Sequence, residues 1–381
     1  MVIEHTLQHE NGMLSYEGGD LARFKKPCFV FSKKRLVEQY ARIRDAFDTF
    51  ISTEVAYSYK TNDSVALGKV FANAGSSFLV CNLRHLAEVA FFSKEIIYYS
   101  TCLTLADAKK VLKSGVRRFI VDSPSAFAVL MEARGDRKLD VLFRVATGVA
   151  SDGLYPTDTC FGMSFAEAKK LMLGVGSDES LRLGVHNHLI SQNADIATWK
   201  KNSDRLVDFI ADLRRSGVVV TCLDLGGGYP IQYIGDAVPG IDALVGALKY
   251  ELLTLQKIFP EMKLIVEPGR FLVGPAGVLV THVFHTKPVE GRNVAMLDVS
   301  VYNASLDSLI VDLQLPFVTN SRGKKVRHMI RGNTPDSLDV FRKEVVLPEL
   351  SEGDLVVFFN AGAYTFNADF LALEKLEVKL I

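Results

Sequence analysis

The sequence predicts an α/β protein of two domains. One is a (β/α)8 barrel of the TIM type over residues 33–270, and the other is a mostly antiparallel β-sandwich or β-barrel domain of residues 1–32 and 271–381. A chain of 381 residues is too long for one ordinary hydrophobic core. Up to Arg270, short apolar runs alternate with amphipathic segments, and after Arg270 strand-like runs follow one another without full helices.

The first part of the chain contains eight short apolar runs, which we expect to be parallel strands. Helical patterns lie between them, as the crossover connections of parallel strands require. An open doubly wound sheet has the same rhythm, but eight units close naturally into a barrel. The expected strands are Val55–Tyr59, Ser77–Cys81, Ile96–Ser100, Arg118–Val121, Val141–Val145, Arg182–Asn187, Cys222–Leu225 and Leu264–Glu267. The expected helices are Ser64–Ala74, Leu83–Phe92, Leu105–Ser114, Ser125–Ala133, Phe165–Leu173 and Ile196–Arg215.

The strand-like runs after Arg270 are typical of an antiparallel β domain. They are Val278–Thr286, Asn293–Val299, Lys325–Arg331 and Asp354–Phe359. The N-terminal run Cys28–Phe31 is also strand-like, and we expect it to complete the same domain.

Composition narrows the class of partner. Lys+Arg and Asp+Glu both number 44, so the net charge does not favour nucleic acid or an anionic membrane, and we expect a small-molecule ligand.

No segment is long and apolar enough to span a bilayer, and residues 1–20 lack the pattern of a signal peptide. The five cysteines are scattered and fit neither a disulfide framework nor a zinc site. We therefore expect a cytoplasmic protein without a metal.

The carboxyl ends of barrel strands carry the active site in folds of this kind, so each strand end is a candidate. The first ends at Lys60, which is costly at a buried position unless it is paired, neutral or covalently bonded. A lysine that extends its amine into solvent is the more common case. The sixth ends at His186 and His188, which could bind a metal, although no further ligands complete a site in the sequence.

Two more strand ends carry anion-binding or ionisable groups. Gly226–Gly228 follows the seventh strand, and such a triplet either forms a tight turn or points N–H groups at an anion. Glu267 and Arg270 follow the eighth strand, where an ordinary ion pair is the simplest interpretation. Four such strand ends together favour one ligand site.

At these residues the chain resembles the group IV, or fold type III, pyridoxal-phosphate decarboxylases, which include ornithine, arginine, diaminopimelate and carboxynorspermidine decarboxylases. The resemblance covers nearly the whole chain, and the motifs follow the family's order. The matching segments are Tyr57–Asn62 (YSYKTN), His188–Gln192 (HLISQ), Gly226–Gly228, Glu267–Arg270 (EPGR), Gly332–Asp339 (GNTPDSLD) and Ala361–Tyr364 (AGAY).

The resemblance implies pyridoxal 5'-phosphate as the cofactor. It implies that Lys60 is the Schiff-base lysine, that His188 stacks on the cofactor ring, and that Glu267 keeps the pyridine nitrogen protonated so that the ring acts as an electron sink. It implies further cofactor contacts, mainly to the phosphate, for Ser191, Gly226, Gly227, Gly228, Gly269, Arg270 and Tyr364. It also implies a homodimer in which the loop with Pro335 and Asp336 completes the partner's active site.

Three positions depart from the family pattern. Pro335 stands where the family has a cysteine credited with returning a proton to Cα, Leu79 replaces an aspartate, and Cys160 replaces a lysine. Because proline has no acid group, that role is vacant or has moved. The departures fit neutral drift in a working decarboxylase, or an altered outcome such as a specialised substrate, racemisation or lost catalysis.

The resemblance gives fewer indications of the substrate. Asp336 matches the aspartate that receives the distal ammonium in ornithine-type enzymes, although loop aspartates often cap turns. Arg144 and Pro335 are the other substrate candidates, and the segment at Asp298 lacks the arginine that diaminopimelate enzymes use.

We expect decarboxylation of a diamino acid, or of a related conjugate with a distal amine, in polyamine, lysine, siderophore or antibiotic-precursor metabolism. The alternatives are a racemase or epimerase, which Glu267 disfavours, and a non-catalytic homologue, which the retained Lys60, His188 and Arg270 disfavour.

Overall fold

The computed structural model describes residues 7–10, 13–150, 160–235, 237–289, 291–365, 368 and 370–381. The chain forms two compact units. The barrel unit comprises Val37–Pro230 and Val238–Gly269, and the β unit comprises Met1–Leu36, Ile231–Ala237 and Arg270–Ile381. Among the helices of the described segments, none combines the length and the apolar character needed to cross a membrane.

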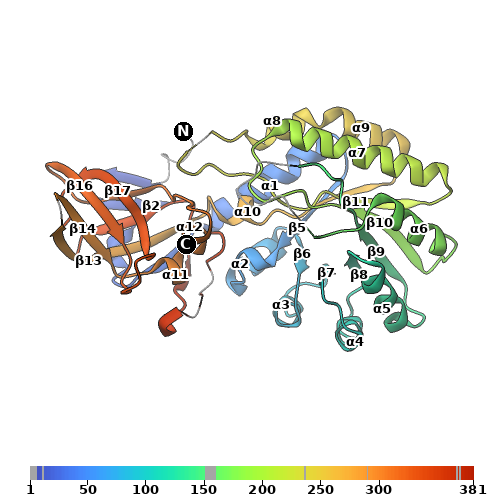
Figure 1. Ribbon diagram of the computed structural model, residues 1–381, viewed down its shortest axis with the longest axis horizontal. Helices are drawn as coiled ribbons and strands as arrows, with labels where there is room; N and C mark the ends of the chain where they lie inside the picture. Colours follow the sequence, from blue (N-terminus) through green and yellow to red (C-terminus); the bar gives the residue numbers. More distant parts are fainter. Residues whose placement is uncertain are drawn as a thin grey trace. The chain divides into compact units, whose positions relative to one another are not determined.

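The barrel unit is a closed barrel of parallel strands (Figure 1). Its strands are β5 (Thr53–Ser58), β6 (Ser77–Val80), β7 (Ile96–Tyr99), β8 (Arg118–Val121), β9 (Leu139–Arg144), β10 (Leu181–His186), β11 (Val220–Asp224) and β12 (Lys263–Val266). Each pairs with the next in the chain, and β12 returns to β5, with Leu264 opposite Thr53 and Val266 opposite Val55. This closing pair confirms the predicted barrel and excludes the open sheet.

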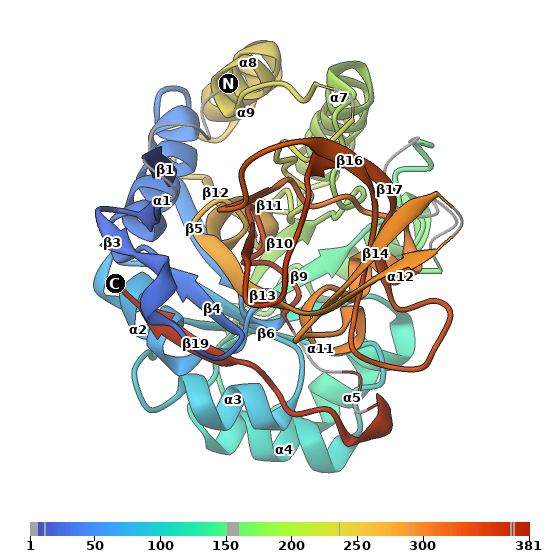
Figure 2. The ribbon, with the colours of Figure 1, turned by 90° about the vertical axis from the view of Figure 1, so that its left-hand side faces the viewer.

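Helices cover the outside of this barrel, as Figure 2 shows for α3, α4 and α5. The predicted helices are present as α2 (Val65–Asn73), α3 (Leu83–Val89), α4 (Leu105–Lys113), α5 (Pro124–Arg134), α6 (Phe165–Val175) and α7 (Ile196–Arg215). Helices α1 (Lys33–Asp48), α8 (Ile241–Ala247) and α9 (Lys249–Ile258) were not predicted. Side chains that accept a backbone N–H fix several helix starts, including Asn82, Thr104, Ser123, Ser164 and Asp195.

The barrel interior is filled in layers, because alternate residues of each strand point inward. One layer is apolar and contains Ala56, Leu79, Ile97, Ile120, Leu142 and Ile265. Two residues beyond these positions, and beyond Gly184 of β10 and Cys222 of β11, the alternation places another side chain on the same inward face. These positions form a second layer, which we call the polar ring: Ser58, Cys81, Tyr99, Asp122, Arg144, His186, Asp224 and Glu267.

The β unit is built around a mixed sheet with the strand order β15-β18-β13-β14-β16-β17. These strands are β13 (Gly277–Val289), β14 (Arg292–Leu297), β15 (Phe317–Thr319), β16 (Lys325–Arg331), β17 (Val340–Pro348) and β18 (Leu355–Phe358). Strand β4 (Cys28–Phe31) pairs with β13, which confirms that the N-terminal run completes this sheet, and β19 (Glu377–Leu380) pairs with β4.

Most strand pairs of the β unit are antiparallel, as predicted, but β14–β16 and β4–β19 are parallel. A small sheet of β1 (Leu7–Glu10), β2 (Met13–Tyr16) and β3 (Gly19–Asp20) belongs to the same unit. The helices of its described residues are short: α10 (Arg270–Val273), α11 (Val301–Ala304) and α12 (Leu306–Ile310). One core cluster packs Cys28 and Val30 against Val278, Leu355 and Val357.

Candidate functional site

Lys60 lies just beyond the end of β5, in a single 3-10 turn of Tyr59–Thr61. Tyr59 and Thr61 are buried, whereas Lys60 is exposed. The residue lies beyond the last strand position that packs inside the barrel, so its position agrees with the more common case considered from the sequence, a lysine that extends into solvent. Its charge still acts on the polar ring, where it partly opposes the rise that burial causes in the pKa of Glu267.

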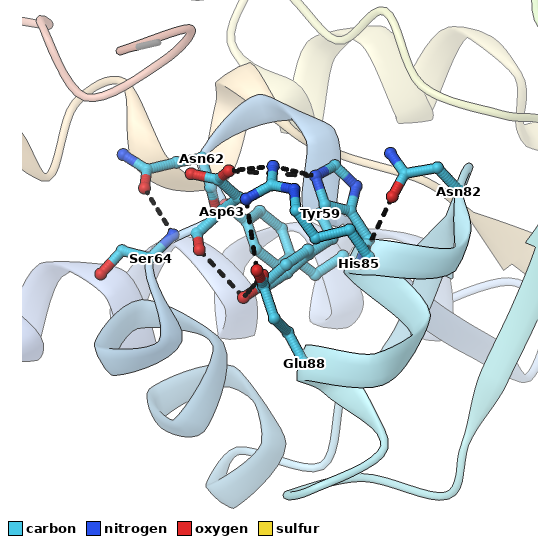
Figure 3. A network of polar contacts seen from close by, with 9 residues as sticks. Tyr59, Asn62, Asp63, Ser64, Asn82, His85 and Glu88 are labelled. Atoms are coloured by element: carbon cyan, nitrogen blue, oxygen red, sulfur yellow. Dashed lines mark hydrogen bonds and ion pairs between the residues drawn. The ribbon is translucent and has the colours of Figure 1, made fainter. Parts of the chain in front are cut away.

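A network of polar contacts holds this turn in place (Figure 3). The proton of the Tyr59 hydroxyl has two acceptors within reach, the carbonyl oxygen of Asp63 at 3.0 Å and Glu88 Oε2 at 3.3 Å. Arg84 bridges the same two acidic residues, with 2.6 Å between its Nη2 and Asp63 Oδ2. The residues on both sides of Lys60 are thus anchored, so its backbone is fixed while its amine is accessible.

His188 and the glycine turn are in direct contact. The N–H of Gly227 donates to Nδ1 of His188 at 3.0 Å, so that nitrogen carries no proton. Burial lowers the pKa of His188 well below its usual value, and the charges of Arg144 and Lys60 add to this. The imidazole is therefore neutral, and the contact sets its orientation and tautomer.

The glycines are required because the surrounding backbone approaches them closely. Gly226 has a φ of +65°, and a Cβ there would lie 2.6 Å from the Asn187 carbonyl oxygen. Gly228 has a φ of +102°, and a Cβ would overlap the Ile190 carbonyl. The turn passes directly beside Ser191, whose Cα would lie 3.8 Å from that Cβ.

Gly269 is constrained in the same way on the other side of the site. A Cβ at Gly269 would overlap the hydroxyl of Thr61, in the turn that carries Lys60. The backbone N–H of Glu267 donates to the Gly226 carbonyl oxygen at 2.8 Å. The predicted residues of the barrel unit therefore lie together: Lys60, His188, Ser191, Gly226, Gly227, Gly228, Glu267 and Gly269.

Glu267 is the carboxylate of the polar ring that was predicted to meet a cofactor nitrogen. Only 5% of the residue is exposed. Burial raises its pKa to about 7, although the neighbouring Asp224 carboxyl group and the charges of Lys60 and Arg144 act in the opposite direction. Its Oε2 lies 3.5 Å from Nε2 of His186, whose pKa burial lowers to about 4.

Arg144 is buried in the polar ring, where its Nη1 donates to the Tyr99 hydroxyl at 2.5 Å. That hydroxyl in turn donates to Asp122 Oδ2 at 3.2 Å. The ring of Phe161 lies 4.8 Å from the guanidinium carbon. Among the described residues, no carboxylate forms an ion pair with Arg144, so its charge is held by aromatic and hydroxyl contacts.

The β unit brings together two other predicted cofactor contacts, Arg270 and Tyr364. The guanidinium carbon of Arg270 lies 4.6 Å from the centre of the Tyr364 ring. The same guanidinium donates to Asp307 Oδ2 at 2.8 Å and to the Tyr233 hydroxyl at 2.9 Å. Neither Asp307 nor Tyr233 was singled out from the sequence.

The loop with the predicted substrate residues Pro335 and Asp336 is organised by Asp339, which is fully buried. Asp339 accepts hydrogen bonds from the backbone of Val301 and from both the backbone and the hydroxyl of Thr334. The carboxylate of Asp336 accepts the N–H of Leu338 at 2.7 Å, which is the turn-capping contact considered as the simpler alternative. Pro335 is exposed.

Sequence reasoning missed part of the polar ring. It held that no cluster completes a metal site at His186, whereas the ligand atoms of His186, Asp224 and Glu267 lie within 4.8 Å of one another. These residues come from three strands, so their proximity depends on the register of the closed barrel. Inward-facing polar residues two positions after apolar ones were the available signal.

The barrel residues fit pyridoxal 5'-phosphate as a bound cofactor. An exposed amine at Lys60 suits its aldehyde, and a glycine turn too tight for side chains suits its phosphate. Glu267 Oε1 is buried and accepts no hydrogen bond from a backbone, amide or basic group of the described residues. A carboxylate oxygen has lone pairs for two donors, so Oε1 has room for a protonated ring nitrogen even beside another donor.

Comparisons with known proteins agree with this fit. The model of the pyridoxal-binding domain of pyridoxal-dependent decarboxylases matches residues 33–274. The chain is 26% identical to diaminopimelate decarboxylase of Methanocaldococcus jannaschii over 373 residues, which cover 92% of this chain and 84% of that protein. It is also 26% identical to lysine/ornithine decarboxylase of Selenomonas ruminantium, and the alignment covers 92% of this chain and 89% of that protein.

A crystal structure of the M. jannaschii diaminopimelate decarboxylase in complex with L-lysine has the same fold. It superposes with a TM-score of 0.92 at 24% identity and covers 100% of this chain and 94% of that chain. The similarity extends over both units, each of which has a counterpart in that structure.

Proposed function

The chain belongs to the family of pyridoxal-dependent decarboxylases, and we propose that it removes the α-carboxylate of a diamino acid or of a related conjugate with a distal amine. One observation supports this most directly. An accessible lysine, a neutral histidine and a buried carboxylate meet at the carboxyl edge of one parallel barrel, beside a glycine turn. That edge is where barrels of this type carry their active sites.

When bound, pyridoxal 5'-phosphate supplies the sink for the electrons that remain on Cα as CO2 leaves. Lys60 provides the amine that bonds the cofactor aldehyde. Glu267 holds a proton on the pyridine nitrogen, because a buried carboxylate facing a cation is stabilised in its charged form. His188, fixed by the N–H of Gly227, packs its neutral ring on the cofactor.

The N–H groups of Gly226 and Gly227 donate to Asp224 and His188, and these bonds fix the shape of the glycine turn. The phosphate would lie against this turn, with Gly228 and Ser191 as its contacts, and Gly269 leaves room for the turn at Thr61. We propose that Arg270 and Tyr364 contribute further phosphate contacts. In the β unit their side chains already lie against each other, and Asp307 holds the guanidinium in place.

The substrate class is proposed from the relatives and from three side chains. The relatives are named for activity on diaminopimelate, lysine and ornithine, which all carry a second amine. Arg144, a buried cation with no carboxylate partner among the described residues, is our candidate for a substrate carboxylate. We propose that Asp336 binds the distal ammonium and that Pro335 shapes the same loop.

Incubating the purified protein with a panel of diamino acids tests the proposal. The assay detects CO2 together with the corresponding amine, and we expect both in equal amounts for at least one member of the panel. Lys60→Ala is the matched control, because it removes the amine and leaves the anchored turn. Racemisation without CO2, or no turnover with any member of the panel, would contradict the proposed function.

A further inference from the structure

Three side chains of the polar ring meet inside the barrel: His186, Asp224 and Glu267. Their relative exposures are 2%, 0% and 5%, so water does not screen their charges. Two ionised carboxylates this close together in a dry interior would repel each other strongly. The arrangement therefore needs a compensating proton or cation.

The hydrogen bonds of the two carboxyl groups leave one oxygen on each without a donor. Oδ1 of Asp224 accepts the N–H of Gly226 at 2.8 Å. Oε2 of Glu267 lies 3.5 Å from Nε2 of His186. Oδ2 of Asp224 and Oε1 of Glu267 are both buried and have no basic or amide donor among the described residues. One proton between these two oxygens would satisfy both, and leaving them unsatisfied is costly.

We propose that Asp224 keeps its proton at mildly basic pH, where Glu267 is ionised, and donates it from Oδ2 to Oε1 of Glu267. Glu267 then carries the single negative charge of the pair. Asp224 acts as a positioning residue, because its other oxygen is bonded to the glycine turn at Gly226. One carboxyl group thus connects the carboxylate that faces the cofactor nitrogen with the turn that faces the phosphate.

The surrounding charges assign the proton to Asp224 rather than to Glu267. Burial raises the pKa of both acids, but the positive charges of Lys60 and Arg144 oppose this at Glu267. At Asp224 the negative charge of Glu267 adds to the effect of burial, and the pKa rises well above its usual value. His186 is neutral, since burial lowers its pKa to about 4, and Tyr229 on the same side keeps its proton because burial raises its pKa.

Infrared spectroscopy of the cofactor-free, full-length protein at mildly basic pH tests the assignment. Ordinary carboxyl groups are ionised there, so the carbonyl stretch of a protonated carboxylic acid identifies a retained proton. We expect this band in the wild type and in Asp122→Asn, a matched control in the same ring, and its loss in Asp224→Asn. A wild type without the band, or a band that persists in Asp224→Asn, would overturn the proposal.

Metal analysis of the same samples shows whether a bound cation, instead of a proton, compensates the two carboxylates. One His and two carboxylates could also hold a divalent metal ion. Stoichiometric bound metal that is lost in Asp224→Asn would show that a cation compensates the charges, and the proposal would be wrong. Metal-free protein that shows the carboxylic acid band supports it.

Cofactor affinity separates the positioning role from a general structural one. Asn at position 224 keeps an oxygen for Gly226 and an N–H donor for Glu267, so we expect the Kd for pyridoxal 5'-phosphate to stay within about threefold. Asp224→Ala removes both contacts and should weaken binding at least about tenfold. Equal losses of cofactor affinity in Asp224→Asn and Asp224→Ala would contradict the positioning role of Asp224. This role rests on the proposed function, whereas the infrared result does not, so the two can fail separately.

Discussion

Replacing Glu267 by Gln should make the cofactor-free barrel more stable, and increasingly so as the pH rises. The carboxyl group has a pKa of about 7 in the folded protein and 4.5 as its ordinary value. Between these values the unfolded chain loses the proton while the folded chain keeps it. Stability therefore falls as pH rises from about 4.5 to about 7, and the loss is complete above that range.

The size of this effect follows from the two pKa values. The complete loss of wild-type stability that this one ionisation causes is about 3.4 kcal/mol in the free energy of unfolding. About 2.5 kcal/mol of that loss occurs between pH 5 and pH 8. Gln cannot ionise, so the stability of Glu267→Gln should not fall in this way. The difference in free energy of unfolding between the variant and the wild type should therefore be about 2.5 kcal/mol larger at pH 8 than at pH 5. The gain reflects the removal of a charge that the fold holds for function.

The assay is urea unfolding of the cofactor-free protein at the two pH values, followed by tryptophan fluorescence. The chain has one tryptophan, Trp199, which is buried in the barrel unit and stacks on Tyr229, so the signal reports on the barrel. Glu132→Gln, at an exposed position of α5, controls for the loss of a carboxylate as such. A stability difference between Glu267→Gln and wild type that does not change with pH would refute the reasoning.

Other predictions concern the cofactor and the substrate. Lys60→Ala should abolish the visible absorbance of the bound cofactor without unfolding the protein, and borohydride labelling of another lysine would show the assignment to be wrong. Asp336→Asn should weaken use of a diamino substrate by about 1.5–3 kcal/mol and affect a neutral analogue far less, as initial rates on both would show. Mixing Lys60→Ala with Asp336→Ala chains should restore some activity if the sites are shared in a homodimer, and no recovery under subunit exchange would count against this. Pro335→Cys should slow inactivation during turnover if reprotonation is the weak step, whereas long-lived turnover of the unmodified protein would mean that another acid has taken over that step.

The sequence was sufficient to predict the barrel because its strands are short, apolar and regularly separated by amphipathic helices. Strand β17 was missed for the opposite reason. Its centre contains Arg342, Lys343 and Glu344, which hide the strand pattern even though Phe341 and Leu347 are buried. Lys343 and Glu344 are exposed, as is common on an edge strand, whereas Arg342 is buried and donates to backbone carbonyl oxygens, so the local composition resembles that of a loop.

Motifs of the site that lie on one continuous stretch of chain could also be found in the sequence, whereas contacts between residues of different β-strands could not. The segment that ends in Lys60 and the glycine triplet each lie on one stretch of chain. The contact between His186 and Glu267 requires β10, β11 and β12 in one register. The exposure of Lys60 depends on where β5 stops, and strand ends are the least certain part of such a prediction.

The departure at Leu79 can be understood from the layers of the barrel. Leu79 is 4% exposed and lies in the apolar layer with Ile97 and Ile120, where an ionised aspartate would need a partner. One layer further along, Arg144 has its partner in Tyr99, whose hydroxyl is also bonded to Asp122. Leu79 thus suits the apolar layer in which it lies, whereas an aspartate there would introduce a buried charge. Arg144 is held by its contact with Tyr99 and has no carboxylate partner among the described residues, which leaves its charge for the substrate carboxylate that we propose.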